Sequence, residues 1–129
     1  MSLADQLKIL IVDDTTTSRM LVRDGLQEIG IKNISFASDG EQGLKHVMTQ
    51  PTHLVISDFN MPKLDGLGLL RAIRQHGPIQ KMPFIMLTGK GDKELVQKAI
   101  QFGINNYLTK PFTVPALKGA LEAVVGKLS

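Results

Sequence analysis

The residues Ile9-Leu10-Ile11-Val12-Asp13-Asp14 combine an unbroken apolar run with two carboxylates that follow it directly. A short apolar run of this kind is typical of a strand that is covered on both faces of a parallel sheet. Further apolar runs occur at 34–37, 54–57, 84–87 and 107–108, and we expect these segments to form the other strands. Their spacing predicts five short strands distributed along the whole chain.

A segment with apolar residues at helical spacing follows each of these runs. The five segments come after Ser18, Asp39, Asp65, Asp92 and Thr113. Side-chain oxygens of Ser, Asp and Thr accept hydrogen bonds from the free backbone N–H groups of a first helical turn, so we expect these residues to be helix N-caps. Five strand–helix repeats predict an α/β fold of the (βα)5 type, in which helices cover both faces of a parallel sheet.

Glycines mark several of the expected helices. Gly30, Gly77 and Gly103 fall where three helices should end, and we expect them to be left-handed C-cap residues. Gly25 and Gly119 lie inside expected helices, where glycine costs up to about 1 kcal/mol relative to alanine. We interpret both as sites of close packing.

Composition limits the class of protein. A chain of 129 residues with 43% hydrophobic residues is expected to form a single domain, residues 1–129, with a substantial core. The absence of cysteine excludes disulfides, thiol catalysis and cysteine-based zinc sites. Neither a membrane-length apolar run nor the pattern of a signal peptide is present, so we expect a cytoplasmic protein without membrane contact.

The net charge of +3 is too small to indicate nucleic-acid binding, and the sequence has no helix-turn-helix pattern. The positive excess is confined to residues 81–129, which contain 7 basic and 3 acidic side chains. Residues 1–80 contain 8 basic and 9 acidic side chains. The basic part is either a solvated surface or a surface that meets an acidic partner.

Polar side chains follow four of the five expected strands. Asp13 and Asp14 follow the first, Asp58 the third, Thr88 the fourth and Lys110 the fifth. The carboxyl ends of parallel strands meet at one rim of the sheet, where ligands of open α/β proteins bind. Each residue alone could be a helix cap, a turn residue or a solvated lysine, but their convergence favours a chemical role.

The charges at this rim suggest the chemistry. Three carboxylates repel one another, and a divalent cation would remove that conflict. Oxygen ligands without His or Cys select Mg²⁺ or Mn²⁺ over zinc. Asp58 is the carboxylate best placed to attack phosphorus and form an aspartyl phosphate. Lys110 would neutralise one phosphoryl oxygen and Thr88 would donate a hydrogen bond to another, which is the positioning that phosphoryl transfer requires.

Five motifs together resemble the response regulator receiver domain over essentially the whole chain: Ile11-Val12-Asp13-Asp14, Ser57-Asp58-Phe59-Asn60-Met61-Pro62, Asp65-Gly66, Leu87-Thr88 and Lys110-Pro111-Phe112. The chain is most similar to the single-domain chemotaxis members, because Asn60-Met61-Pro62 follows Asp58 and Tyr107 precedes Lys110 by three residues. The resemblance implies a flavodoxin-like fold with strand order 2-1-3-4-5 and a cis peptide bond between Lys110 and Pro111.

The resemblance also implies roles for the acidic rim. Asp58 would be the phosphoacceptor, and a sensor histidine kinase, here the chemotaxis kinase, would be the phosphodonor. Asp14 and Asp58 would hold Mg²⁺ directly, Asp13 would hold it through water, and Asn60 would contribute its backbone carbonyl. The protein would not be an enzyme beyond catalysing its own phosphorylation and dephosphorylation.

Four further residues acquire roles by the same resemblance. Thr88 and Lys110 would contact the phosphoryl group, and Tyr107 would be a switch aromatic that turns inward once Thr88 moves toward the phosphate. Tyr107 could instead be an ordinary surface aromatic of an edge strand. Lys90 occupies a position where the best-known chemotaxis regulators have Glu. We expect Lys90, together with Asn60, to modulate the lifetime of the phosphate, in a direction that the sequence does not give.

The leading interpretation is a monomeric, stand-alone phosphorylation switch whose output is contact with a protein such as the flagellar motor switch. The contact face would be formed by the fourth expected helix, the fifth strand and the fifth helix. A phosphate sink that drains the chemotaxis kinase is an alternative within the family. A phosphatase with an aspartate nucleophile is a remote one, because it needs a second Asp where this chain has Asn60.

Overall fold

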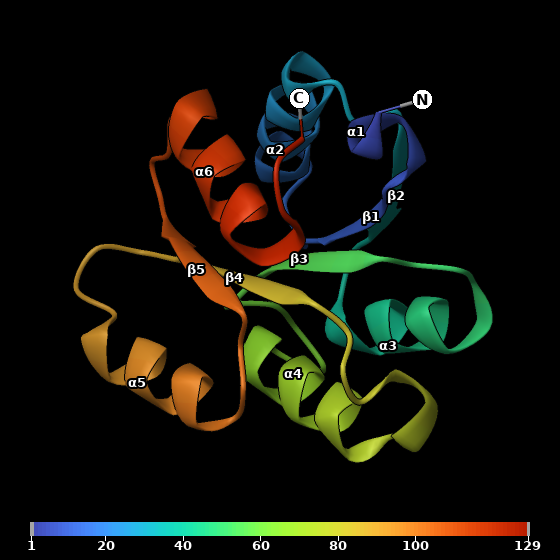
Figure 1. The fold of residues 1–129 in the computed structure, drawn as a ribbon. Coiled ribbons are helices and arrows are strands. Elements are labelled where there is room, and N and C mark those ends of the chain that lie inside the picture. Colours follow the sequence, from blue (N-terminus) through green and yellow to red (C-terminus); the bar gives the residue numbers. More distant parts are fainter. Residues whose placement is uncertain (1, 129) are drawn as a thin grey trace.

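A five-stranded parallel sheet forms the centre of the computed structural model, which describes residues 2–128 (Figure 1). The strand order is β2-β1-β3-β4-β5, and every pair of neighbours is parallel. This confirms the predicted flavodoxin-like arrangement. The strands are β1 (Lys8–Val12), β2 (Asn33–Ala37), β3 (Leu54–Asp58), β4 (Phe84–Thr88) and β5 (Asn106–Thr109).

Helices cover both faces of this sheet (Figure 1). On one face lie α2 (Thr16–Ile29) and α6 (Val114–Val125), and on the other lie α3 (Gly40–Thr49), α4 (Gly66–Gln75) and α5 (Lys93–Gln101). The short helix α1 (Leu3–Gln6) and the 3₁₀ turn η1 (Gly77–Ile79) were not predicted, because segments of this length show no helical periodicity. Across residues 2–128, none of the helices is both long and apolar enough to cross a bilayer.

Strand β1 shows how the two cores arise. Ile9 and Ile11 pack in the core beneath α2 and α6, whereas Leu10 and Val12 pack in the core on the opposite face. All four side chains are almost completely buried. Because successive residues of a strand point to opposite faces, a strand covered on both sides has no position left for a polar side chain until it ends.

The predicted helix starts are correct for α3, α4, α5 and α6, and three of these helices also have the expected side-chain cap. Asp39, Asp65 and Thr113 each accept a hydrogen bond from a backbone N–H in the first turn of α3, α4 and α6. The prediction for α2 was wrong, because this helix begins at Thr16 and Ser18 already lies in its first turn. The side chain of Ser18 is therefore available for another contact.

Two of the three predicted glycine C-caps are confirmed as left-handed residues. Gly30 has a φ of 110° at the end of α2, and Gly103 has a φ of 91° just after α5. The prediction for Gly77 was wrong. Helix α4 ends at Gln75, its C-cap residue His76 is extended, and Gly77 begins the 3₁₀ turn that follows.

The two glycines inside helices differ in their surroundings. A Cβ atom on Gly25 of α2 would lie 2.9 Å from Leu117 Cδ2 of α6, so close packing is confirmed at this position. A Cβ atom on Gly119 would meet no atom within 4 Å, so the same interpretation was wrong there. The absence of a side chain at Gly25 lets α2 and α6 approach closely.

Candidate functional site

The carboxyl ends of β1 and β3 bring three acidic side chains together. Asp13, Asp14 and Asp58 each place one carboxylate oxygen within 4.8 Å of the others. The two strands are neighbours in the sheet, which is why segments distant in the sequence meet here. Asp13 is fully buried, Asp58 is half-buried and Asp14 is exposed.

Asp13 has an incompletely satisfied carboxylate. Its Oδ1 accepts a hydrogen bond of 3.0 Å from the backbone N–H of Thr15. Its Oδ2 is, within residues 2–128, the buried side-chain polar atom that lacks a hydrogen-bond partner, and Lys110 Nζ lies 3.7 Å from it. Burying a carboxylate oxygen without a partner costs free energy, so this atom favours the binding of a cation.

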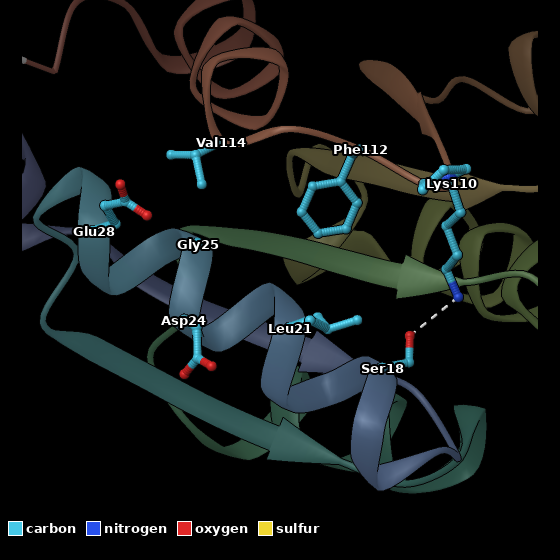
Figure 2. A pocket seen from close by; sticks show the side chains of 9 residues that line it. Ser18, Leu21, Asp24, Gly25, Glu28, Lys110, Phe112 and Val114 are labelled. Atoms are coloured by element: carbon cyan, nitrogen blue, oxygen red, sulfur yellow. Dashed lines mark hydrogen bonds between the residues drawn. The ribbon is translucent and has the colours of Figure 1, made fainter.

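Lys110 supplies the positive charge at the rim. Its Nζ lies 2.9 Å from Asp58 Oδ1 and donates a hydrogen bond of 3.1 Å to Ser18 Oγ on α2. The peptide bond between Lys110 and Pro111 is cis, in agreement with the expectation from the resemblance. Figure 2 shows the lysine extending from the segment after β5 toward Ser18.

The environment of Asp58 opposes its ionisation. Burial raises the pKa of the Asp58 carboxyl above its ordinary value of 3.8, and the negative charge of Asp13 acts in the same direction. The hydrogen bond and the positive charge of Lys110 lower this pKa, but they offset only part of the effect of burial. The Lys110 ammonium group therefore does not fully offset the effect of burial on Asp58.

The donor set fits a hard divalent cation. The three clustered carboxylates offer oxygen ligands, and one of their oxygens is buried without a partner. Mg²⁺ and Mn²⁺ prefer oxygen ligands, whereas zinc sites usually include His or Cys. The Asp cluster can thus bind a metal ion of this class.

The segment after β3 is shaped by a close approach of two backbones. A Cβ atom on Gly66 would lie 2.4 Å from the carbonyl oxygen of Asp58, so a larger residue cannot be placed here without displacing the backbone. The Gly66 N–H donates a hydrogen bond of 2.8 Å to the carbonyl of Phe59. These contacts fix the segment that contains Asn60, which is exposed. The sequence identified the Asp65-Gly66 motif but not this reason for it.

The segment between β4 and α5 contains Thr88 and Lys90. Thr88 is buried at the end of β4, and Lys90 is exposed two residues later. Asp92 stands at the predicted N-cap position of α5, but its side chain accepts a hydrogen bond of 2.8 Å from Gly89 N–H and none from the helix. The predicted N-cap position of Asp92 is therefore confirmed, but the expected capping hydrogen bond was wrong, because its carboxylate closes the preceding loop instead.

Tyr107 lies on the outer surface of edge strand β5. Its side chain is 43% exposed, and it borders an open groove together with Thr88, Lys90 and Thr109. Thr88 Oγ1 lies 3.5 Å from Thr109 Oγ1, which links the ends of β4 and β5. This outward orientation of Tyr107 leaves room for it to move, and its role as a switch stays a prediction.

Sequence reasoning missed two residues of α2 that contact the site. Ser18 was expected to be a helix cap, but it accepts a hydrogen bond from Lys110. Arg19 Nη1 donates a hydrogen bond of 2.7 Å to the carbonyl of Asp13. Only the placement of α2 beside the rim gives them this function, and no periodicity or cap pattern indicates it.

Comparison with known proteins gives consistent matches. The response regulator receiver domain family matches residues 9–122. A probable chemotaxis protein CheY of Rhizobium etli is 56% identical over 128 residues, which are 99% of each chain. The structure of the chemotaxis response regulator CheY4 of Vibrio cholerae has a TM-score of 0.83 and 30% identity, covering 92% of this chain and 98% of that one. The receiver domain of a sensor histidine kinase of Pseudomonas aeruginosa, solved with magnesium in its active-site cleft, has a TM-score of 0.82 and 29% identity, covering 94% and 98%.

Proposed function

The chain belongs to the response regulator receiver domain family, and we propose that a chemotaxis histidine kinase phosphorylates it on Asp58 in the presence of Mg²⁺. It is a CheY-like receiver of chemotaxis signalling. The observation that supports the chemistry is the convergence of three carboxylates and one ammonium group at a single rim, with Asp58 Oδ1 2.9 Å from Lys110 Nζ.

In the proposed reaction, a carboxylate oxygen of Asp58 forms a bond to phosphorus while the bond from phosphorus to the histidine nitrogen of the donor breaks. Lys110 neutralises negative charge on a phosphoryl oxygen, and the Thr88 hydroxyl donates a hydrogen bond to another. Asp13, Asp14, Asp58 and the carbonyl of Asn60 would hold Mg²⁺. The bound ion would supply positive charge that stabilises the phosphoryl oxygens.

The phosphorylation is tested by mass spectrometry of the intact protein after incubation with acetyl phosphate and Mg²⁺. The wild type should gain the mass of one phosphoryl group, and the Asp58→Asn variant should not. Addition of EDTA should suppress the gain in the wild type. An unchanged wild-type mass, or an equal gain in the Asp58→Asn variant, would contradict the assignment.

The output we propose is contact with a motor-switch protein or another protein target through α5, β5 and α6. This face lies within residues 81–129, which contain the positive excess of the chain, and it includes the exposed Tyr107. An acidic amphipathic helix is the complementary partner. Affinity for such a peptide should increase when beryllofluoride mimics the phosphate and decrease with added salt. Binding that is insensitive to both would count against this partner.

We further propose that the protein acts as a stand-alone, monomeric, cytoplasmic receiver. The Rhizobium etli relative, which is matched over 99% of its own length, supports a receiver of this size. Gel filtration with light scattering tests the oligomeric state, and a dimer with or without phosphate would refute the monomer.

Lys90 is exposed in the groove that Thr88 borders, and we propose that it modulates the lifetime of the aspartyl phosphate. Its ammonium group can pair with phosphoryl oxygens or obstruct the attacking water. The hydrolysis rate of phosphorylated Lys90→Ala should differ from that of the wild type. Equal hydrolysis rates would refute this role of Lys90. Separately, rapid hydrolysis in a wild type that does not bind the acidic helical peptide would favour a phosphate sink.

A further inference from the structure

The contact between α2 and Lys110 points to a function for Ser18 that goes beyond helix formation. We propose that Ser18 is a positioning residue that holds the Lys110 ammonium group at the phosphoacceptor. Lys110 Nζ donates a hydrogen bond of 3.1 Å to Ser18 Oγ (Figure 2). The same nitrogen lies 2.9 Å from Asp58 Oδ1, so it is held between the two oxygens. This inference rests on the phosphoryl transfer to Asp58 proposed above.

Within residues 2–128, the side chain of Ser18 makes no hydrogen bond other than the one with Lys110. The N-cap position of α2 belongs to Thr15, and Ser18 Oγ accepts its hydrogen bond from Lys110. A hydroxyl at the N-cap position commonly accepts a hydrogen bond from a backbone N–H of the first turn. Ser18 lies three residues beyond that position, and its hydroxyl faces the rim of the sheet. Its contact therefore indicates a role toward Lys110 and not toward the helix.

A lysine needs such an anchor because its charge sits at the end of a long, flexible chain. Lys110 is partly exposed and borders a pocket of about 490 Å³ between α2 and the start of α6. The near walls of this pocket include the apolar side chains of Leu21 and Phe112, which offer the ammonium no acceptor. The acidic side chains Asp24 and Glu28 also line this pocket, but they lie toward its opposite end, away from the Lys110 ammonium group (Figure 2). Among these side chains of the pocket wall, Ser18 is therefore the acceptor that lies beside the ammonium group.

The reaction changes one of the two acceptors and leaves the other unchanged. When Asp58 accepts a phosphoryl group, its carboxylate becomes an acyl phosphate and the negative charge moves to the phosphoryl oxygens. Lys110 must then follow that charge. Ser18 Oγ is the same neutral acceptor before and after the transfer, so it keeps the ammonium near the site while its ionic partner changes.

Helix α2 is held firmly enough to act as this fixed point. Arg19, the next residue, donates a hydrogen bond of 2.7 Å to the carbonyl of Asp13, which ties the first turn to the end of β1. Farther along α2, Gly25 packs closely against Leu117 of α6. A functional group on a rigid element maintains the geometry of a site better than one on a mobile loop.

The test compares Ser18→Thr with Ser18→Val, two variants of the same shape of which only the first retains a hydroxyl. The rate constant for phosphorylation by acetyl phosphate with Mg²⁺ should be close to wild type for Ser18→Thr. It should be about three- to tenfold lower for Ser18→Val, the effect expected from the loss of one hydrogen bond. Thermal unfolding should be the same for both variants. Equal rates for the two variants would overturn the proposal.

A second comparison shows whether Ser18 acts through Lys110. In a Lys110→Ala background, the difference between Thr and Val at position 18 should disappear, and a difference that persists would refute the positioning role. If the Lys110→Ala variants are phosphorylated too slowly to compare, a measurement that does not depend on phosphorylation replaces the rates. Nitrogen-15 NMR should show slower hydrogen exchange of the Lys110 ammonium in Ser18→Thr than in Ser18→Val, and equal exchange would also refute the role.

These outcomes are distinct from a failure of phosphorylation itself. If the wild type gains no phosphoryl group on Asp58, the proposed function fails, whatever the two variants do. If the wild type is phosphorylated and Thr and Val are equivalent at position 18, only the role of Ser18 fails.

Discussion

The α2–α6 side and the α5–β5 side of the molecule differ in how tightly their side chains pack. On the α2–α6 side, Leu117 is fully buried and lies against Gly25 without space for an added Cβ atom. On the α5–β5 side, Ala99 is the buried residue of α5, whereas Leu108, the buried residue of β5, packs into the core beneath α2 and α6. Local stability follows the extent of apolar burial, so the α5–β5 side should open more readily. The proposed switch residue Tyr107 lies on this loosely packed side.

The largest effect should come from removing apolar volume on each side. Leu117→Ala is expected to lower the free energy of unfolding by about 2–5 kcal/mol, because it leaves a cavity in the core. Ile100→Ala on α5, whose side chain is 57% exposed, should change it by less than about 0.5 kcal/mol. Urea unfolding of both variants tests the contrast. Comparable losses would show that the two sides are equally packed.

The next effect distinguishes tight from open positions within the α2–α6 side. Gly119→Ala should increase stability by about 0.5–1 kcal/mol, since it improves helix propensity and its Cβ meets open space. Gly25→Ala should be less stable than Gly119→Ala by about 1–3 kcal/mol, because its Cβ lies 2.9 Å from Leu117 Cδ2. Thermal unfolding of the two variants provides the measurement. An equal increase in stability for both variants would mean that α2 and α6 can move apart to accept a Cβ atom at Gly25 without loss of stability.

A smaller effect should appear at the rim where the two sides meet. The pKa of the Asp58 carboxyl is raised in the folded protein above its ordinary value of 3.8, which applies in the unfolded chain. The folded protein therefore binds a proton on Asp58 more readily than the unfolded chain does. In metal-free buffer, the wild type should therefore lose stability relative to Asp58→Asn as the pH rises from below 3.8 through the raised folded pKa. Lys110 limits the size of this loss. Urea unfolding of both proteins across this range gives the sign, and the opposite trend would refute the role of burial.

The smallest effect on stability should come from the exposed aromatic of β5. Tyr107→Ala should change the free energy of unfolding by less than about 0.5 kcal/mol, because much of the side chain is already in solvent. The neighbouring Leu108→Ala should cost about 2–5 kcal/mol, since Leu108 is buried in the core beneath α2 and α6. If Tyr107 reports the phosphorylated state, Tyr107→Ala should nevertheless weaken phosphate-dependent binding of the acidic peptide. Unaltered binding would remove Tyr107 from the switch.

Local patterns in the sequence predicted the sheet and most helix starts because burial and capping depend on neighbouring residues. The run Ile9-Leu10-Ile11-Val12 indicates a strand covered on both faces, and Asp39 caps α3 as expected. The acidic rim was also predictable, because carboxyl ends of parallel strands must meet at one edge.

Contacts that join distant segments could not be predicted in this way. Ser18 and Lys110 are separated by 92 positions, and their hydrogen bond depends on how α2 lies beside the end of β5. The difference between Gly25 and Gly119 depends likewise on which helix passes nearby. The misplaced C-cap at Gly77 has a related cause, since the 3₁₀ turn that it begins was too short to detect.

The Asp92 carboxylate has a consequence for how the α5–β5 side can rearrange. Because it accepts from Gly89 N–H, the Asp92 side chain makes no capping hydrogen bond to the first turn of α5. A displacement of Gly89 that follows a movement of Thr88 would release this carboxylate beside the N–H groups of that first turn. The loop and the helix thus compete for one acceptor, and reshaping the loop need not lower the total number of hydrogen bonds.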